Sequence, residues 1–238
     1  MSEFTSILLT PQRIVEFFKE RKLPEPQYRI YADRTVFIRK EGSEGVDPGD
    51  LLPELHREFP RAILRFGNVP WIENLVKRLI ERKEMVSTAE SCTGGLIGAL
   101  LTDIPGSSKV YWGGVITYSN EAKVHLLGVP ERVLLESGAV SRETVTLMAQ
   151  QAMGMGNTQW GIGVSGIAGP TGGTTEKPVG TVYIALSGSN GYLRVERIQF
   201  TGTRQEIRKK TALLSLLLLE SCVCKEFDID IERLNAYI

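Results

Sequence analysis

The sequence predicts an α/β protein: a three-layer α/β/α domain with a mixed sheet, preceded by a small N-terminal α+β appendage. Three observations support this. From residue 71 onward, apolar runs typical of strands alternate with segments of helical periodicity, two late runs are joined by the turn Gly188–Gly191, and 238 residues can bury a sizeable core. The alternation indicates parallel strands, and the hairpin adds an antiparallel pair.

Residues 1–66 are expected to form the appendage, whose role the sequence does not define, and residues 67–238 the main domain. The apolar patterns of the appendage predict, in chain order, helix 11–21, strands 28–32 and 35–39, helix 49–58 and strand 62–66. The charged segment 40–50 contains two glycines and a proline, so it is expected to be an exposed loop. Because no catalytic cluster is found in it, docking or dimerisation is the role that we favour for the appendage.

The main domain begins with a helix over 71–82, where Ile72, Leu75 and Leu79 follow helical spacing. Ser141 is a predicted N-cap, with Glu143 in the first helical turn. The other expected elements, in order, are strand 85–89, a helix that ends before Pro105, a buried strand over 110–117, helix 120–127, a helix from Ser141 to about Met153, strand 160–164, a hairpin of strands 179–187 and 192–200, and a long helix after Gly202.

The segment 85–100 organises the main domain. It reads as a strand, a tight turn at Gly94 and Gly95, and a helix, with Ser91 in the turn. A helix that starts there would direct its unpaired N–H groups and the positive end of its dipole at an anion or a developing oxyanion. The alternative is that Ser91 and Thr93 only cap the helix.

Composition excludes several classes of protein. Lys plus Arg equals Asp plus Glu at 28 each, and the longest basic run is Arg208–Lys210, so a nucleic-acid partner is not expected. The longest apolar stretch, residues 212–219, is too short to span a membrane, and no secretory signal is recognisable, so we expect a cytoplasmic protein. Three cysteines and two histidines provide few of the usual zinc ligands, and no metal site is predicted.

Three further residues are expected near Ser91. Ser165 ends another predicted strand, so both hydroxyls open into one crevice if the two strands are parallel neighbours. Tyr118 ends the strand that leads into helix 120–127, and Lys123 lies near the start of that helix. Burial near a helix N-terminus disfavours a charged lysine, which makes Lys123 a candidate base; an ordinary solvated lysine is the alternative.

A glycine-rich loop over 166–180 is too long to be a mere connection and is expected to fold over a ligand. Its glycines and threonines could form an anion-binding nest. Thr203-Arg204-Gln205-Glu206 fits the capping-box pattern and places Arg204 at the first helical position, where a cation opposes the helix dipole. A substrate phosphate or carboxylate would favour Arg204 there, and an acidic neighbour is the alternative.

Three motifs in order carry a family resemblance: TAESCTGG at 88–95, TYSNEAK at 117–123 and GVSGIAGP at 163–170. Together they resemble the C-terminal domain of the CinA family, which includes nicotinamide mononucleotide (NMN) amidohydrolases. The resemblance runs from about Trp71 to about Val223. It implies hydrolysis of the NMN carboxamide to nicotinate mononucleotide and ammonia, a step of pyridine nucleotide salvage, without metal or organic cofactor.

The resemblance also implies a functional set. By matching position, the catalytic candidates are Ser91, Tyr118, Lys123 and Ser165, where relatives often have threonine in place of Ser165. Matching position makes Arg204 a substrate-binding candidate, and the turn and loop described above add the candidates Gly94, Gly95, Gly166, Thr171 and Gly172. We expect a homo-oligomer with NMN as its small-molecule partner. Two alternatives stay open, namely a non-catalytic nucleotide-binding or regulatory module, and an amidase that uses Glu90, Lys123 and Cys92 with the thiol as nucleophile.

Overall fold

The computed structural model describes residues 3–38, 52–59, 64–66, 68–225 and 229–235. The chain divides into two compact units, one formed by Met1–Trp71 with Phe227–Ile238 and the other by Ile72–Glu226. The prediction placed everything after residue 66 in one domain. The structure differs at both limits, because the start of the first main-domain helix and the C-terminal residues group with the N-terminal unit.

The N-terminal unit is an α+β structure, as expected. Its elements are β1 (Glu3–Ser6), α1 (Pro11–Glu20), β2 (Gln27–Ile30), β3 (Thr35–Ile38), α2 (Leu52–Glu58), β4 (Leu64–Phe66) and α9 (Ile231–Asn235). The strands pair antiparallel in the order β2-β3-β1-β4. Neither β1 nor α9 was predicted, and the expected loop over 40–50 lies outside the described residues. Ile14, Phe17 and Phe18 of α1 bury the apolar face that its helical spacing predicts.

The larger unit is a three-layer α/β/α structure around a mixed sheet, which confirms the predicted fold class. Its elements are α3 (Trp71–Arg82), β5 (Val86–Glu90), α4 (Leu96–Thr102), the 3₁₀ turn η1 (Ser107–Lys109), β6 (Tyr111–Ile116), α5 (Asn120–Leu127), α6 (Glu131–Glu136), α7 (Arg142–Gly156), β7 (Trp160–Gly166), β8 (Thr181–Gly188), β9 (Leu193–Gln199) and α8 (Arg204–Cys224). The sheet order is β6-β5-β7-β8-β9. Strands β6, β5 and β7 are parallel, and β8 and β9 form the antiparallel hairpin.

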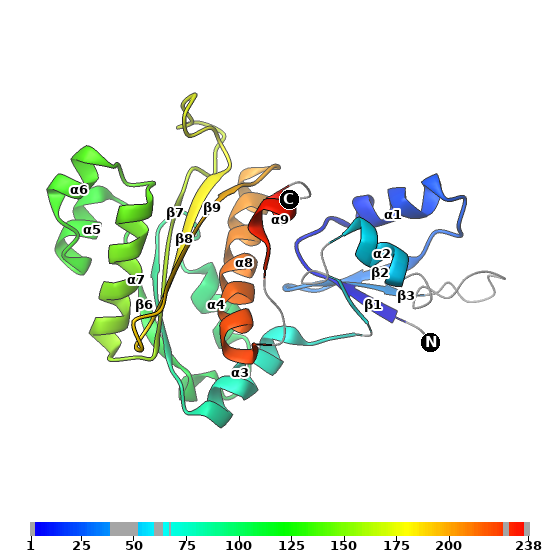
Figure 1. Cartoon of the computed structure of the whole chain (residues 1–238), viewed down its shortest axis with the longest axis horizontal. Helices are drawn as coiled ribbons and strands as arrows, with labels where there is room; N and C mark the ends of the chain where they lie inside the picture. Colours follow the sequence, from blue (N-terminus) through cyan, green and yellow to red (C-terminus); the bar gives the residue numbers. More distant parts are fainter. Residues whose placement is uncertain (1–2, 39–51, 60–63, 67, 226–228, 236–238) are drawn as a thin grey trace. The chain divides into compact units, whose positions relative to one another are not determined.

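Helices cover both faces of this sheet. Helices α5 and α7 lie on one face, and α4 and α8 lie on the other (Figure 1). Ala89 of β5 packs on the first face with Leu127 of α5 and Met148 of α7. Gly161 and Gly163 of β7 allow α7 to approach closely, because a Cβ at either position would clash with the backbone of Ala149 or Val145.

Two local expectations for this unit need correction. The strand over 110–117 was expected to be buried, but β6 is an edge strand whose residues alternate between exposed and half-buried. Helix α6 was not predicted, since Pro130 and the short segment after it resemble a loop in the sequence. By contrast, Ser141 caps α7 as predicted, its Oγ accepting a hydrogen bond from the Thr144 N–H at 3.2 Å.

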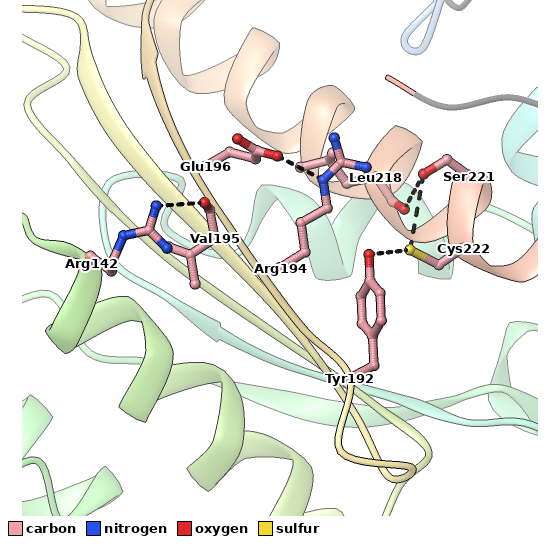
Figure 2. A network of polar contacts seen from close by, with 8 residues as sticks. All are labelled: Arg142, Tyr192, Arg194, Val195, Glu196, Leu218, Ser221 and Cys222. Carbon is pink, nitrogen blue, oxygen red and sulfur yellow. Dashed lines mark hydrogen bonds and ion pairs between the residues drawn. The ribbon is translucent and has the colours of Figure 1, made fainter. Parts of the chain in front are cut away.

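The cysteines near the end of α8 take part in polar packing against the hairpin. The Cys222 thiol donates to the Tyr192 hydroxyl at 3.2 Å, and the Arg194 side chain pairs with Glu196 at 2.7 Å (Figure 2). Burial, together with the bond from Cys222, raises the pKa of Tyr192 to about 12. The Cys222–Tyr192 contact joins the C-terminal part of α8 to the turn of the hairpin, so Cys222 has a packing role.

Candidate active site at the Ser91 turn

The Ser91 turn, residues 91–95, follows directly after β5 and is held by backbone hydrogen bonds. The Ser91 N–H donates to the Val164 carbonyl of β7 at 3.0 Å, and the Gly94 N–H donates to the Ser91 carbonyl at 3.2 Å. Gly94 and Gly95 have φ values of 61° and 95°, a left-handed conformation that glycine adopts without steric cost. The two glycines therefore allow the sharp reversal that the sequence predicts.

Successive side chains at the end of β5 point to opposite faces of the sheet. Ala89 contributes to the core beneath α5 and α7, whereas the Glu90 carboxylate contacts the first turn of α4. Ser91 follows the alternation back to the side of Ala89, where helix α5 supplies Lys123. Strand alternation thus brings the Ser91 hydroxyl to Lys123, and not the thiol of the neighbouring Cys92.

Lys123 contacts Ser91 directly and makes two hydrogen bonds with described residues. Its Nζ donates to Ser91 Oγ at 3.2 Å and to the Thr117 carbonyl at 2.7 Å. Only 1% of the residue is exposed, and no carboxylate pairs with it in the described part of the chain. Burial therefore lowers the pKa of the Lys123 ammonium below its ordinary value. An ordinary solvated helix lysine is excluded.

Glu90 occupies the N-terminus of α4. Its carboxylate, in a residue only 2% exposed, accepts hydrogen bonds from the N–H groups of Gly95 at 2.9 Å, Ile97 at 3.2 Å and Gly98 at 3.0 Å. A carboxylate is the group that a helix N-terminus favours. The expectation that these N–H groups meet a substrate anion is therefore wrong, and so is the alternative in which Ser91 or Thr93 caps α4.

The Cys92 thiol does not have the properties of a nucleophile. It is buried, and burial raises its pKa to about 12, with the nearby Glu90 carboxylate adding to the effect. No hydrogen bond joins Glu90 to Lys123 or Cys92 among the described residues, since the Glu90 oxygens bind α4. The geometry does not assemble the Glu90, Lys123 and Cys92 set of a cysteine amidase.

Ser165 lies beside the Ser91 turn. Strands β5 and β7 are parallel neighbours, and the last pair of their ladder is Glu90 with Val164, so Ser91 and Ser165 each follow that pair by one residue. Ser165 is 1% exposed. The condition that the two strands are parallel neighbours is met, so both serines lie at the same edge of the sheet, and a crevice shared by their hydroxyls stays a prediction.

A second cluster lies at the surface, and we call Tyr118, Gly169 and Arg204 the rim. The Arg204 guanidinium donates to the Tyr118 hydroxyl at 3.0 Å and to the Gly169 carbonyl at 2.9 Å. It makes no ion pair with any described residue, so the alternative of an acidic neighbour is not realised. The predicted capping box is present, with Thr203 and Glu206 exchanging hydrogen bonds at the start of α8.

The loop after β7 carries the remaining predicted residues. Gly166 ends β7 half-buried, and Thr171 and Gly172 are exposed at the surface. The N–H groups of Thr171 and Gly172 donate no hydrogen bond within the described ranges. Lys177 fixes the far side of the loop, its Nζ donating to the Ser137 carbonyl at 3.0 Å. The loop thus presents free N–H groups near the arginine that binds its Gly169.

Three side chains at the site were not predicted. Arg208 of α8 donates to the carbonyls of Cys92 and Thr93, and the Thr93 and Thr117 hydroxyls are buried without a partner among the described residues. The spacing of Arg204 and Arg208, one helical turn apart, is a signal that could have pointed to Arg208. The two threonine hydroxyls could not have been found from sequence, because their burial depends on the packed turn.

The described residues contain no group of three or more His, Cys, Asp or Glu side chains placed to hold a metal ion. None of their helices has the length and apolar character needed to cross a lipid bilayer.

Residues 69–223 match the family of CinA C-terminal domains. A "CinA-like protein" of Prochlorococcus marinus subsp. pastoris is 46% identical over 154 residues, covering 65% of this chain and 36% of that protein. Another from Endomicrobium trichonymphae is 51% identical over 202 residues, covering 81% of this chain and 46% of that protein. The chain thus spans less than half the length of either relative.

The Endomicrobium match covers 81% of this chain, which is more than the family domain at 69–223 and the residues after Val223 amount to together. It therefore includes part of the N-terminal unit, whereas the family domain itself covers residues 69–223 and confirms the expected limits near Trp71 and Val223. Among solved structures, the competence/damage-inducible protein of Agrobacterium tumefaciens is 42% identical with a TM-score of 0.60, covering 64% of this chain and 95% of that one. The corresponding Klebsiella pneumoniae protein is 32% identical with a TM-score of 0.61, covering 66% of this chain and 99% of that one.

Proposed function

Because the chain belongs to the family of CinA C-terminal domains, we propose that it is an amidohydrolase that converts NMN to nicotinate mononucleotide and ammonia. The observation that carries the proposal is the buried contact of 3.2 Å between Lys123 Nζ and Ser91 Oγ. A serine needs an adjacent base to become a nucleophile, and a lysine whose pKa is lowered by burial can be that base. The names of the relatives specify no substrate, so the choice of NMN rests on the resemblance of the three motifs.

The proposed reaction has two steps. In the first, neutral Lys123 accepts the Ser91 hydroxyl proton while Oγ bonds to the carboxamide carbon, and the carbonyl π electrons move to the oxygen. Collapse of this intermediate breaks the C–N bond, and the leaving group departs as ammonia with the proton from Lys123. In the second, water attacks the ester, gives a proton to Lys123, and releases the carboxylic acid and Ser91, which takes the proton back.

The rim supplies the binding groups in this proposal. Arg204 has no ion pair within the described ranges and offers a planar donor for the NMN phosphate. The free N–H groups of Thr171 and Gly172 add neutral donors of the kind that bind phosphate in backbone nests. Tyr118 and Ser165 would orient the pyridine ring and its carboxamide between rim and Ser91.

The direct test is to incubate the purified protein with NMN and measure both ammonia and nicotinate mononucleotide. We expect equal amounts of the two products from the wild type, and none above background from Ser91→Ala. An exposed-surface variant, Arg132→Ala, is the matched control and should behave as the wild type. Wild-type protein that binds NMN but releases no ammonia would instead identify a non-catalytic nucleotide-binding module.

A further inference from the structure

Arg208 of α8 contacts the backbone of the Ser91 turn. Its Nε donates to the Cys92 carbonyl at 3.0 Å, and its Nη2 donates to the Thr93 carbonyl at 2.8 Å. The side chain is half-buried and forms no ion pair within the described ranges. Two of the guanidinium donors of Arg208 are thus committed to consecutive backbone carbonyls, so the side chain fixes the turn.

The peptide that joins Cys92 to Thr93 is planar, and its C=O and N–H point in opposite directions. Arg208 binds the carbonyl of this peptide from the α8 side, so the Thr93 N–H is directed away from α8. That N–H donates to no acceptor in the described part of the chain. A positively charged donor on the carbonyl also draws electron density from the peptide, which makes its N–H a stronger donor.

Most of the other N–H groups around this peptide are engaged, although those of Cys92 and Leu96 also donate no hydrogen bond in the described part of the chain. The Ser91 N–H binds the Val164 carbonyl and the Gly94 N–H binds the Ser91 carbonyl, while the Glu90 carboxylate takes those of Gly95, Ile97 and Gly98. A Cβ at Gly94 would lie 3.2 Å from Arg208 Nη2, so glycine also gives the guanidinium room. Of the N–H groups left open, that of Thr93 belongs to the peptide whose carbonyl Arg208 binds, and it lies two residues along the chain from Ser91.

We infer that Arg208 is a positioning residue that holds and polarises the Cys92–Thr93 peptide, so that the Thr93 N–H stabilises the oxyanion formed when Ser91 attacks a carbonyl. This inference rests on the proposed function of Ser91. As the Oγ–C bond forms, the Ser91 proton passes to Lys123 and the carbonyl π electrons move to the oxygen, which becomes the oxyanion. A preorganised donor at this oxygen lowers the barrier because the negative charge exists only in the transition state and the intermediate.

The test compares Arg208→Met, Arg208→Lys and the control Lys209→Met, a neighbouring exposed residue of α8. Two substrates are used, namely NMN and p-nitrophenyl acetate, whose ester carbonyl also forms an oxyanion on serine attack. For Arg208→Met we expect kcat on NMN, and the ester acylation rate, to fall about 10- to 100-fold, as expected for losing a hydrogen bond to a charged group. KM should stay within about threefold, Arg208→Lys should recover part of the rate because it keeps the charge, and Lys209→Met should match the wild type.

A raised KM with an unchanged kcat would overturn the inference, since Arg208 would then bind the substrate itself, and so would unchanged rates in both Arg208 variants. Thermal melting shows whether Arg208→Met folds. If it does not, Arg208→Lys is used instead, and the inference requires that its kcat falls while its KM stays nearly unchanged. A wild type that cleaves the ester through Ser91 but leaves NMN intact refutes only the proposed substrate. A wild type no faster on the ester than Ser91→Ala refutes the inference.

Discussion

The Ser91 turn and the rim belong to one edge of the same sheet but differ in burial. Ser91 and Lys123 are 7% and 1% exposed, and backbone contacts to β7 and to Thr117 fix both of them. Tyr118 is 63% exposed, and Arg204 reaches it over the protein surface. Burial is what lowers the pKa of Lys123, whereas exposure leaves Arg204 accessible to an anion. Changes at the turn should therefore act on kcat, and changes at the rim on KM.

The largest effect is expected from the two neighbouring nucleophile candidates. Ser91→Ala should lower kcat for NMN hydrolysis by several powers of ten, because it removes the group that forms the covalent bond. Cys92→Ala should keep most of the activity, since the Cys92 thiol is buried with its pKa raised to about 12. Steady-state ammonia release measures both variants. If Cys92→Ala were inactive and Ser91→Ala active, the argument from strand alternation that Ser91 is the nucleophile would be wrong.

Lys123→Met should come next, with a loss in kcat of about a thousandfold, within the range for removing a general base. In the wild type, kcat/KM should rise with pH as Lys123 loses its proton, with a midpoint below the ordinary lysine pKa. Measuring kcat/KM of the wild type from pH 6 to pH 11 gives the midpoint of this rise. A midpoint at or above the ordinary lysine value would show that Lys123 is not the base.

The same variant carries a stability prediction with a definite sign. The folded state binds the Lys123 proton less tightly than the unfolded state, so the unfolding free energy of the wild type rises with pH between the folded pKa and the ordinary value. Below the folded pKa, the buried charge reduces stability by a constant amount. Lys123→Met should lack this slope, which denaturant titrations of both proteins at several pH values would measure. Parallel slopes would contradict the burial argument.

Arg204→Ala tests the rim and should raise KM for NMN about 10- to 100-fold with little change in kcat, as expected for losing a hydrogen bond to a charged group. Nicotinamide riboside, which lacks the phosphate, should be turned over equally by the wild type and this variant. The matched control is Arg132→Ala, which removes an arginine exposed on α6. Equal losses on both substrates would show that Arg204 does not bind the phosphate.

The smallest effect is expected from removing the N-terminal unit. A fragment of residues 72–226 should fold and keep turnover within about threefold, because Ser91, Lys123 and the rim all lie in the larger unit. Solved relatives that are covered almost completely by the match to this unit support independent folding. Circular dichroism and NMN kinetics check both expectations. A folded fragment that cannot bind NMN would place part of the site in the N-terminal unit.

How well the sequence predicts a feature of this protein depends on how far apart in the sequence the interacting residues lie. Local signals located α3, α5, the Ser141 cap and the Thr203 capping box, since each depends on residues within one helical turn. The alternation of strands and helices predicted parallel strands, whereas the pairing of β5 with β7 was only a condition in the prediction and is supplied by the structure. Helix propensity and spacing therefore carried most of the fold of the larger unit.

Sequence reasoning failed where a tertiary contact decides the outcome. Glu90 precedes the first residue of α4 by six positions, so no capping rule identifies it, and only the folded turn brings its carboxylate to α4. Arg208 was counted as part of a basic run, whereas its role depends on α8 packing behind the turn. The edge position of β6 is likewise set by the sheet order, which apolar periodicity does not encode.

The central claim is that Ser91 forms a covalent intermediate while Lys123 moves the proton. Acid quenching of the wild type during NMN turnover, followed by peptide mass spectrometry, tests it most directly. We expect a peptide that carries NMN minus ammonia on the Ser91 hydroxyl, present in Cys92→Ala and absent in Ser91→Ala. The same mass on Cys92, or steady turnover without any label on Ser91, would contradict it.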